Sequence, residues 1–480
     1  MVYPKVSIAN LEDVLQHDIK VKVAGIDADG VLRGKIMSKT KFLAAVSKGF
    51  GMSSAIFCWD MHDETYNIGD VQPSEAPGYG DFVAVPDLTS FRRSKWDDGL
   101  PLVLLDFYNN DGMRFPACPR GLLKTILARL QHEDAQAHAG VELEFFNYCT
   151  PTDATPESKL AKPGRIASFL KDNPPSKLVP LTDGMFGYSV TRPVMNKDYF
   201  NAIYDHCYDF DCELEGWHTE SGPGVFEAVS SATYLTKSLG ALHGITPSFM
   251  AKPSASLPGN SGHIHLSLTS LSTGTNLFAA TSSHPPPSSS SSSSPSPYPD
   301  LATLSPLGQH FLAGLLAALP DIMPLLAPTV NSYKRLVPNY WAPTRVSYGL
   351  EDRRAAVRVV APPHCEPAAT RFEVRVPGAD AHPHYAIAAC VGAGWRGVEG
   401  RMEVGMAPLG KEEDEGEGGG KALPGSLEEA TRRFKAEGSV AREIFGDGFV
   451  EFYARTREHE VGLYRQAVTD WEVQRYIEIV

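Results

Sequence analysis

The cysteines of this sequence form no recognisable disulfide or metal-binding motif. Its seven cysteines are scattered, none stands in a Cys-x-x-Cys pair, and their number is odd. Such a set favours neither a disulfide framework nor a thiolate zinc site. The first residues also lack a basic stretch followed by an apolar one, so we expect no signal peptide. Together these absences predict a soluble protein of a reducing compartment, the cytoplasm.

Other absences narrow the possible functions. There is no surplus of basic residues, and the net charge of −13 argues against a nucleic-acid partner or a polybasic membrane contact. Residues 312–326 are apolar, but Pro320 and Pro324 interrupt them, so we expect no membrane-spanning segment. The chain has no phosphate-binding P-loop, no Gly-x-Gly-x-x-Gly opening a helix and no nucleophile elbow.

The 480 residues are enough for two or three globular domains, and the hydrophobic fraction of 42% is ordinary for such a protein. The first part of the chain is rich in predicted strands. A hairpin is expected around Asp29-Gly30, and strands are expected at residues 21–32, 55–59, 82–85 and 102–107. We therefore predict a small N-terminal domain over residues 1–112.

The pattern changes after residue 112. Residues 119–132 carry apolar positions at helical spacing and open with Pro119, which predicts a helix. Helices then alternate with strands, so residues 113–480 are predicted to form an α+β catalytic domain. A Ser/Pro-rich segment at 281–299 and an acidic, Gly-rich segment at 410–422 cannot bury apolar surface. Both are predicted to be disordered surface insertions.

Ionisable residues spaced two apart recur in four predicted strands. Because alternate side chains of a strand share one face, each strand presents a polar face. The sets are Glu142 and Glu144; Glu213 and Glu215, with His218 and Glu220 on the opposite face; His263, His265 and Ser267; and Arg371, Glu373 and Arg375. Each strand alone could be the solvent-facing side of an amphipathic sheet. Glu, His and Arg on all four favour instead one central site for Mg²⁺ or Mn²⁺.

A second cluster is rich in arginine. Arg335, Arg353 and Arg358 lie within residues 331–359. Guanidinium groups bind phosphates and carboxylates through two parallel hydrogen bonds. The alternative is surface arginines paired with Glu351 or Asp352, an arrangement that is common and weak.

In this order, the segments GVELEFF, WHTESGPGVFE, FMAKP with GNSGHIHLSL, NSYKRLVP and RFEVRVP resemble the motifs of the glutamine synthetase family. They cover most of residues 117–400, and GIDADGVLRGK resembles the family's N-terminal β-grasp domain. The resemblance implies a funnel-shaped site of antiparallel strands with helices outside. It also implies a homo-oligomeric ring with active sites between subunits.

The resemblance also assigns roles to residues. One metal ion is implied at Glu144, Glu220 and Glu227, and a second at Glu142, His263 and Glu373. Glutamate binding is implied for Gly262, Arg335 and Arg375; ATP binding is implied for Glu215, His265 and Ser267, with Arg353 and Arg358 on its phosphates. The implied reaction is transfer of a phosphoryl group from ATP to the γ-carboxylate of glutamate, followed by attack of an amine. Arg353, Arg358 and Glu373 are the catalytic candidates, because such a transfer depends on charge stabilisation.

Two positions depart from glutamine synthetases proper. Those enzymes carry an Asp in an Asp-Gly-Ser-Ser motif where this chain has Gly51, and a Glu after the Arg-Leu-Val-Pro segment where it has Trp341. Both acids serve ammonium, so the departures resemble γ-glutamylputrescine and γ-glutamylpolyamine synthetases. Trp341 is therefore predicted to contact the amine, through its alkyl chain or its charge. The alternative is that Trp341 fills core volume.

Three readings of the function stay open at this point. The first is a γ-glutamyl-amine ligase, in which Asp60, Asp63 and Glu64 are candidates to receive the far ammonium group of a diamine. The second is a glutamine synthetase that uses ammonium. The third is an inactive structural relative.

Overall fold

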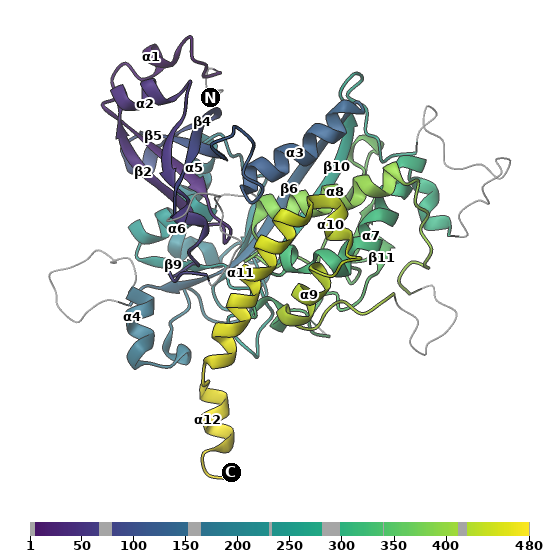
Figure 1. Ribbon diagram of the computed structural model, residues 1–480. Helices are drawn as coiled ribbons and strands as arrows, with labels where there is room; N and C mark the ends of the chain where they lie inside the picture. The colour runs from purple at the N-terminus through teal and green to yellow at the C-terminus, as the bar shows by residue number, and fades with distance from the viewer. Residues whose placement is uncertain are drawn as a thin grey trace.

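The N-terminal part of the chain forms a curled five-stranded sheet (Figure 1). The computed structural model describes residues 5–66, 79–151, 165–229, 233–280, 298–338, 340–410 and 420–479. The sheet has the order β2-β1-β5-β4-β3, and β1 runs parallel to β5 while the other pairs are antiparallel. Its strands are β1 (Lys20–Ile26), β2 (Leu32–Ser38), β3 (Phe50–Ser53), β4 (Asp81–Ser94) and β5 (Leu100–Tyr108). Two short helices, α1 (Leu11–Val14) and α2 (Lys39–Ala45), complete this half-barrel domain.

The hairpin predicted around Asp29-Gly30 is confirmed. The side chain of Asp27 accepts hydrogen bonds from the backbone N–H groups of Asp29 (3.0 Å) and Val31 (2.8 Å). Gly30 has a φ of 83°, which glycine adopts without steric cost. The side chain of Asp27 therefore closes the turn between β1 and β2.

The strand predicted at residues 55–59 is wrong. Residues Ser54–Phe57 form a 3₁₀ helix, η1, whose first turn is capped by the side chain of Ser53 accepting from the N–H of Ala55. Phe57 is fully buried and packs edge-on against Phe107, with ring centroids 5.3 Å apart. The local cap and this aromatic packing outweigh the strand preference of the apolar run.

The second sheet has eight strands and the order β11-β12-β13-β10-β6-β8-β7, with β9 paired to the end of β6. Its longest strand, β6 (Ala135–Cys149), pairs antiparallel with β10 and then β9 along one edge and with β8 along the other. The remaining strands are β7 (Trp217–Thr219), β8 (Val225–Val229), β9 (Ile245–Ser248), β10 (Gly262–Ser270), β11 (Tyr348–Leu350), β12 (Val357–Val360) and β13 (Arg371–Val374).

Helices pack around this second sheet. The helix predicted at residues 119–132 is confirmed as α3 (Pro119–His132). The others are α4 (Arg165–Asp172), α5 (Lys197–Asp209), α6 (Thr233–Leu242), α7 (Pro306–Leu326), α8 (Pro383–Glu399), α9 (Leu427–Phe434), α10 (Val440–Phe445), α11 (Asp447–Gln466) and α12 (Asp470–Tyr476). Helices α7, α8, α9 and α10 pack on one another, and α12 projects away from both sheets (Figure 1). The predicted α+β organisation is confirmed.

Helix α7 corrects one expectation. It continues through Pro320 and Pro324, which were predicted to interrupt it. Among the described helices it is the one whose length and composition would allow it to cross a membrane. However, 83% of its most apolar stretch of 18 residues is buried inside the protein. A close approach to α8 explains this burial, because a Cβ at Gly314 would lie 2.6 Å from the backbone of Gly397.

Two predictions on domain organisation stay predictions. The boundary at residue 112 falls in the connection between β5 and α3. The segments predicted as insertions, 281–299 and 410–422, lie mostly outside the described residues.

Candidate active site

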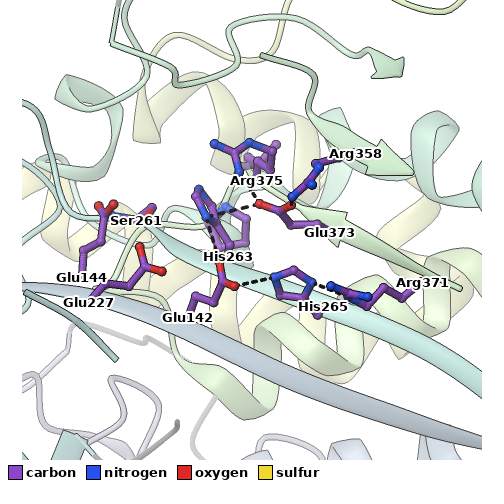
Figure 2. Close-up of polar contacts among 12 residues, drawn as sticks. Glu142, Glu144, Glu227, Ser261, His263, His265, Arg358, Arg371, Glu373 and Arg375 are labelled. Carbon is purple, nitrogen blue, oxygen red and sulfur yellow. Dashed lines mark hydrogen bonds and ion pairs between the residues drawn. The ribbon is translucent and has the colours of Figure 1, made fainter. Parts of the chain in front are cut away.

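Strand pairing brings three candidate metal ligands together on β6, β10 and β13 (Figure 2). His263 lies directly opposite Glu142 in the β6–β10 pair, and His265 lies opposite Glu373 in the β10–β13 pair. Nδ1 of His263 is 3.5 Å from Oε2 of Glu142 and 3.5 Å from Oε1 of Glu373. The predicted second-metal set of Glu142, His263 and Glu373 is thus one cluster, which we call the β10 cluster.

The protonation states of the β10 cluster suit a cation. Burial raises the pKa of the Glu142 carboxyl, but contacts with His263 and His265 outweigh burial and hold it well below its usual value. Burial also raises the pKa of the Glu373 carboxyl, but its contacts with His263 and Arg375 outweigh burial, so that pKa is lowered. Burial and the charge of Arg375 lower the pKa of His263, which keeps its ring neutral. Two carboxylates and a neutral imidazole are suitable ligands for Mg²⁺ or Mn²⁺.

A second cluster forms where β7 pairs with β8. His218 lies opposite Glu227 in this pair, and Glu220 follows β7 directly. Nδ1 of His218 is 3.4 Å from Oε1 of Glu220, and its Nε2 is 3.5 Å from Oε1 of Glu227. We call His218, Glu220 and Glu227 the β8 cluster. It contains two of the three ligands predicted for the first metal.

The third predicted ligand of that metal, Glu144, lies beside the β8 cluster. It is opposite Glu227 in the β6–β8 pair, but its Oε2 accepts the backbone N–H of Ser261 at 2.5 Å (Figure 2). Burial, and then the charge of Glu227, raise the pKa of the Glu144 carboxyl to about 7. Crowded carboxyls with raised pKa values are the arrangement that a divalent cation stabilises.

The two arginines predicted to bind glutamate, Arg335 and Arg375, are both buried. Nη2 of Arg335 donates to the backbone carbonyls of Arg375 (2.9 Å) and Pro377 (2.7 Å), whereas its Nε has no hydrogen-bond partner within the described part of the chain. Arg375 pairs with one oxygen of Glu373, and Arg358 donates to the other at 2.8 Å. Buried guanidinium groups with spare donors are suited to binding an anionic substrate group.

Gly262, also predicted at the substrate site, lies where two backbone segments meet. Its N–H donates to the carbonyl of Pro377 at 2.9 Å, and a Cβ at this position would lie 2.5 Å from the carbonyl oxygen of Gly378. Only glycine fits there without a backbone shift.

Of the remaining predicted nucleotide ligands, Arg358 contacts the β10 cluster through Glu373, whereas no hydrogen bond or ion pair among the described residues joins Glu215, Ser267 or Arg353 to either cluster. Glu215 is exposed ahead of β7, so the strand predicted from residue 213 is wrong, because β7 covers only Trp217–Thr219. Ser267 lies on β10 opposite His138, and Arg353 is exposed in the turn after β11. Arg358 pairs with Glu351 as well as with Glu373. The roles of these residues toward ATP stay predictions.

His265 belongs to a chain of contacts that its predicted role in ATP binding did not include. Its Nε2 lies 2.9 Å from Oε1 of Glu142, and Nε of Arg371 donates to its Nδ1 at 3.1 Å (Figure 2). Arg371 received no role from the sequence, although it shares the strand face of Glu373 and Arg375. The alternation of Arg371, Glu373 and Arg375 along the strand was the sequence signal that could have pointed to Arg371.

Tyr188 is a second residue without a predicted role. Its ring stacks on His218 with centroids 4.2 Å apart, and its backbone has a φ of 56°. It comes from the segment before α5, where no sequence pattern pointed to a site.

Trp341 does not fill core volume, so that alternative is wrong. Its side chain is 67% exposed, and its φ of 53° is uncommon for a bulky residue. Beside this turn, the ammonium group of Lys252 lies 4.2 Å from the centroid of the Tyr340 ring.

Two acidic clusters on one sheet, with the buried arginines Arg335 and Arg375 outside its strands, define a class of enzyme that binds divalent cations together with phosphate or carboxylate groups. The family model described as the glutamine synthetase catalytic domain matches residues 116–476. The chain therefore belongs to the glutamine synthetase family of ATP-dependent ligases and is a glutamate–ammonia or glutamate–amine ligase. The third reading of the sequence, an inactive relative, has no support.

Relatives with both kinds of acceptor are similar over nearly the whole chain. Type-1 glutamine synthetase 2 of Dictyostelium discoideum is 37% identical, over 100% of this chain and 88% of the relative. A glutamate–isopropylamine ligase from Pseudomonas sp is 30% identical, over 99% of both chains. A γ-glutamylethanolamide synthetase of Streptomyces coelicolor is 30% identical, over 95% and 92%.

Solved structures support the fold. A structure described as a GmaS/ADP complex superposes with a TM-score of 0.75 at 24% identity, covering 98% of this chain and 99% of that one. The curled N-terminal domain and the catalytic domain predicted from the resemblance are both confirmed at the level of fold.

Proposed function

We propose that this protein uses ATP to join the γ-carboxylate of glutamate to an organic amine. The observation that carries the proposal is Trp341, which stands 67% exposed where glutamine synthetases carry a glutamate. An exposed indole offers an apolar face to an alkyl chain and a π-face to an ammonium group, and it offers no carboxylate to accept the proton of ammonium.

The charged groups fit the first half-reaction. The β10 cluster and the β8 cluster are suited to hold divalent cations, which, when bound, offset phosphate charge during phosphoryl transfer. Arg335 and Arg375 are buried, which supports a role for their guanidinium groups in binding the carboxylates of glutamate. Because hydrogen bonds hold Arg335 and an ion pair with Glu373 holds Arg375, these donor groups stabilise developing charge with little reorganisation.

The second position that departs from glutamine synthetases is Gly51 on β3. A Cβ built there would lie 2.3 Å from Oδ2 of Asp81, so a side chain at this position would have to displace that carboxylate. Residue 51 therefore contributes no carboxylate of its own. The names of relatives point the same way, because enzymes described as acting on isopropylamine, ethanolamide and anilide products share this family.

Glutamine synthesis from ammonium is the second candidate. Asp81 favours it, since its carboxylate occupies the space beside Gly51 and supplies a negative charge there. The 37% identical relative is also described as a glutamine synthetase.

Phosphate release with glutamate, ATP and Mg²⁺ or Mn²⁺ separates the two candidates. The acceptor panel contains ammonium, short alkylamines, ethanolamine, putrescine and longer polyamines. We expect kcat/KM for at least one organic amine to exceed that for ammonium. Ammonium turnover as efficient as that of every amine tested would overturn the proposal in favour of glutamine synthesis.

Substitution of Trp341 tests the residue that carries the proposal. Trp341→Glu is expected to lower kcat/KM for larger amines at least tenfold, because a carboxylate replaces the apolar surface. Trp341→Phe keeps an aromatic ring and is the matched control, with a loss of a few-fold. Equal losses for ammonium and for amines in both variants would show that Trp341 does not select the acceptor.

A further inference from the structure

A third group of metal-ligand side chains lies outside the β10 and β8 clusters. Asp60 and Glu64 stand in the loop after η1, and His459 stands on α11, nearly 400 positions later in the chain. One ligand atom from each side chain lies within 4.8 Å of the other two. The loop is closed by backbone hydrogen bonds from Asp60 N to Glu64 O (2.8 Å) and from Asp63 N to Asp60 O (3.1 Å).

Hydrogen bonds fix the orientation of Asp60. Its Oδ1 accepts the backbone N–H groups of His62 (2.7 Å) and Glu64 (3.0 Å), and its side chain is only 9% exposed. Oδ2 is left facing Nε2 of His459, at 3.4 Å. One oxygen thus holds the carboxylate in place and the other is available to a ligand.

His459 presents a shielded nitrogen to this carboxylate. Nε2 is buried from solvent and has no hydrogen-bond partner among the described residues. The 3.4 Å gap to Asp60 exceeds the 2.7–2.9 Å or so of a charge-assisted hydrogen bond. The ring is held edge-on against Tyr66, with centroids 5.2 Å apart. A buried, unpaired nitrogen in a fixed ring is a group that needs a partner.

The distance between Nε2 of His459 and Oδ2 of Asp60 matches the distance between two ligands of one metal ion. Two donors about 2.1 Å from an ion at a tetrahedral angle lie about 3.4 Å apart. The His–carboxylate distances in the β10 and β8 clusters are 3.4 to 3.5 Å, the same as between His459 and Asp60.

We propose that Asp60, Glu64 and His459 form a binding site for a divalent cation of the Zn²⁺ or Mn²⁺ class. One imidazole and two carboxylates are a ligand set that these ions accept. None of the three residues belongs to the catalytic clusters. A bound ion would join the loop that follows the curled sheet's η1 to helix α11, and so tie the N-terminal domain to the C-terminal helices.

Zinc binding to the full-length protein without nucleotide tests the site. Equilibrium dialysis is expected to give one more bound equivalent for the wild type than for His459→Gln. Glu64→Gln is a second variant, and because Glu64 is exposed its substitution leaves the fold intact; a loss of affinity of at least tenfold is expected. His62→Gln is the matched control, an exposed histidine of the same loop outside the ligand set, with stoichiometry unchanged.

Anomalous scattering at the zinc edge locates the ion directly. Crystals grown with Zn²⁺ are expected to show a peak between Asp60 and His459, and the wild type is expected to gain a higher unfolding midpoint with Zn²⁺ than His459→Gln gains. No peak there, or equal zinc stoichiometry in the wild type and both ligand variants, would overturn the proposal and leave an ion pair of His459 with Asp60. Both measurements are made without glutamate or an amine, so their outcome is independent of the acceptor assay.

Discussion

Glu142 and His263 are direct partners across the β6–β10 pair, and Nδ1 of His263 lies 3.5 Å from Oε2 of Glu142. The hydrogen-bonded ladder of the two strands, rather than a loop, sets the distance between these ligands. Side chains on paired strands move little relative to each other, so the β10 cluster is preorganised for its cation.

Glu142→Gln is expected to lower the affinity for Mn²⁺ at least tenfold, because an amide oxygen carries no net charge toward the ion. Isothermal titration with Mn²⁺ in the absence of nucleotide measures the change. Glu133→Gln, at the exposed end of α3, is the matched control. Unchanged Mn²⁺ affinity in Glu142→Gln would remove Glu142 from the metal site.

Arg371→Met is expected to weaken Mn²⁺ binding between about tenfold and a hundredfold, the usual effect of losing a group that orients a ligand. Arg371 donates to Nδ1 of His265, which places the ring proton on Nε2, facing Glu142. Without Arg371 the ring can turn or take the other tautomer. Arg129→Met, on the outside of α3, should bind Mn²⁺ as the wild type does. The same titration decides the matter, since a role for Arg371 in nucleotide binding alone would leave the metal affinity unchanged.

His382 is expected to make the protein less stable as the pH falls below about 6.5. Burial lowers the pKa of this histidine to about 4, although its Nε2 donates to the carbonyl of Asp27. The unfolded chain therefore binds a proton at pH 5 that the folded chain does not, and stability falls by about 2 kcal/mol between pH 7 and pH 5.

Urea unfolding of the wild type and His382→Gln at both pH values isolates this contribution. The loss of stability on acidification should be smaller in the variant by about 2 kcal/mol. His17→Gln, at an exposed position, should behave as the wild type does. Parallel pH profiles for the wild type and His382→Gln would contradict the prediction.

Arg457→Met is expected to destabilise the protein by about 3–5 kcal/mol, because it leaves Asp29 charged and buried. Both side chains are 3% exposed, and Nη1 of Arg457 also donates to the carbonyl of Pro328 at 2.8 Å. Denaturant unfolding gives the loss, and Asp29→Asn combined with Arg457→Met should restore part of it. Arg433→Met, at a half-exposed pair with Asp321, should cost less than about 1 kcal/mol. A similar small cost for Arg457→Met would show that the buried pair does not hold the two parts of the chain together.

A metal site on β6, β10 and β13 could be predicted from the sequence because ionisable residues alternate along these strands, whereas the particular set of Glu142, His263 and Glu373 was implied by the family resemblance. A period of two identifies a shared face, and Glu142, His263 and Glu373 do share one. The helix over residues 119–132 was equally clear, since its start carries its own signal in Pro119.

Other features depend on tertiary contacts that a single segment does not reveal. The approach of His459 to Asp60 brings together distant parts of the chain, and Tyr188, which stacks on His218, comes from an irregular segment. The run at 55–59 has strand composition, but Phe57 is held in η1 by aromatic rings of β4 and β5. Packing overrode local preference there.

The position of His263 on β10 has a consequence for how the sequence can diverge. Its distance from Glu142 depends on ladder pairing alone, and residues 281–299 enter the chain only after β10 ends and before α7 begins. Lengthening that connection costs little in loop-closure entropy and leaves the pairing register unchanged. This connection is therefore free to change in length over evolution, while a single-residue insertion between two ligands of one strand would turn one of them to the opposite face of the sheet.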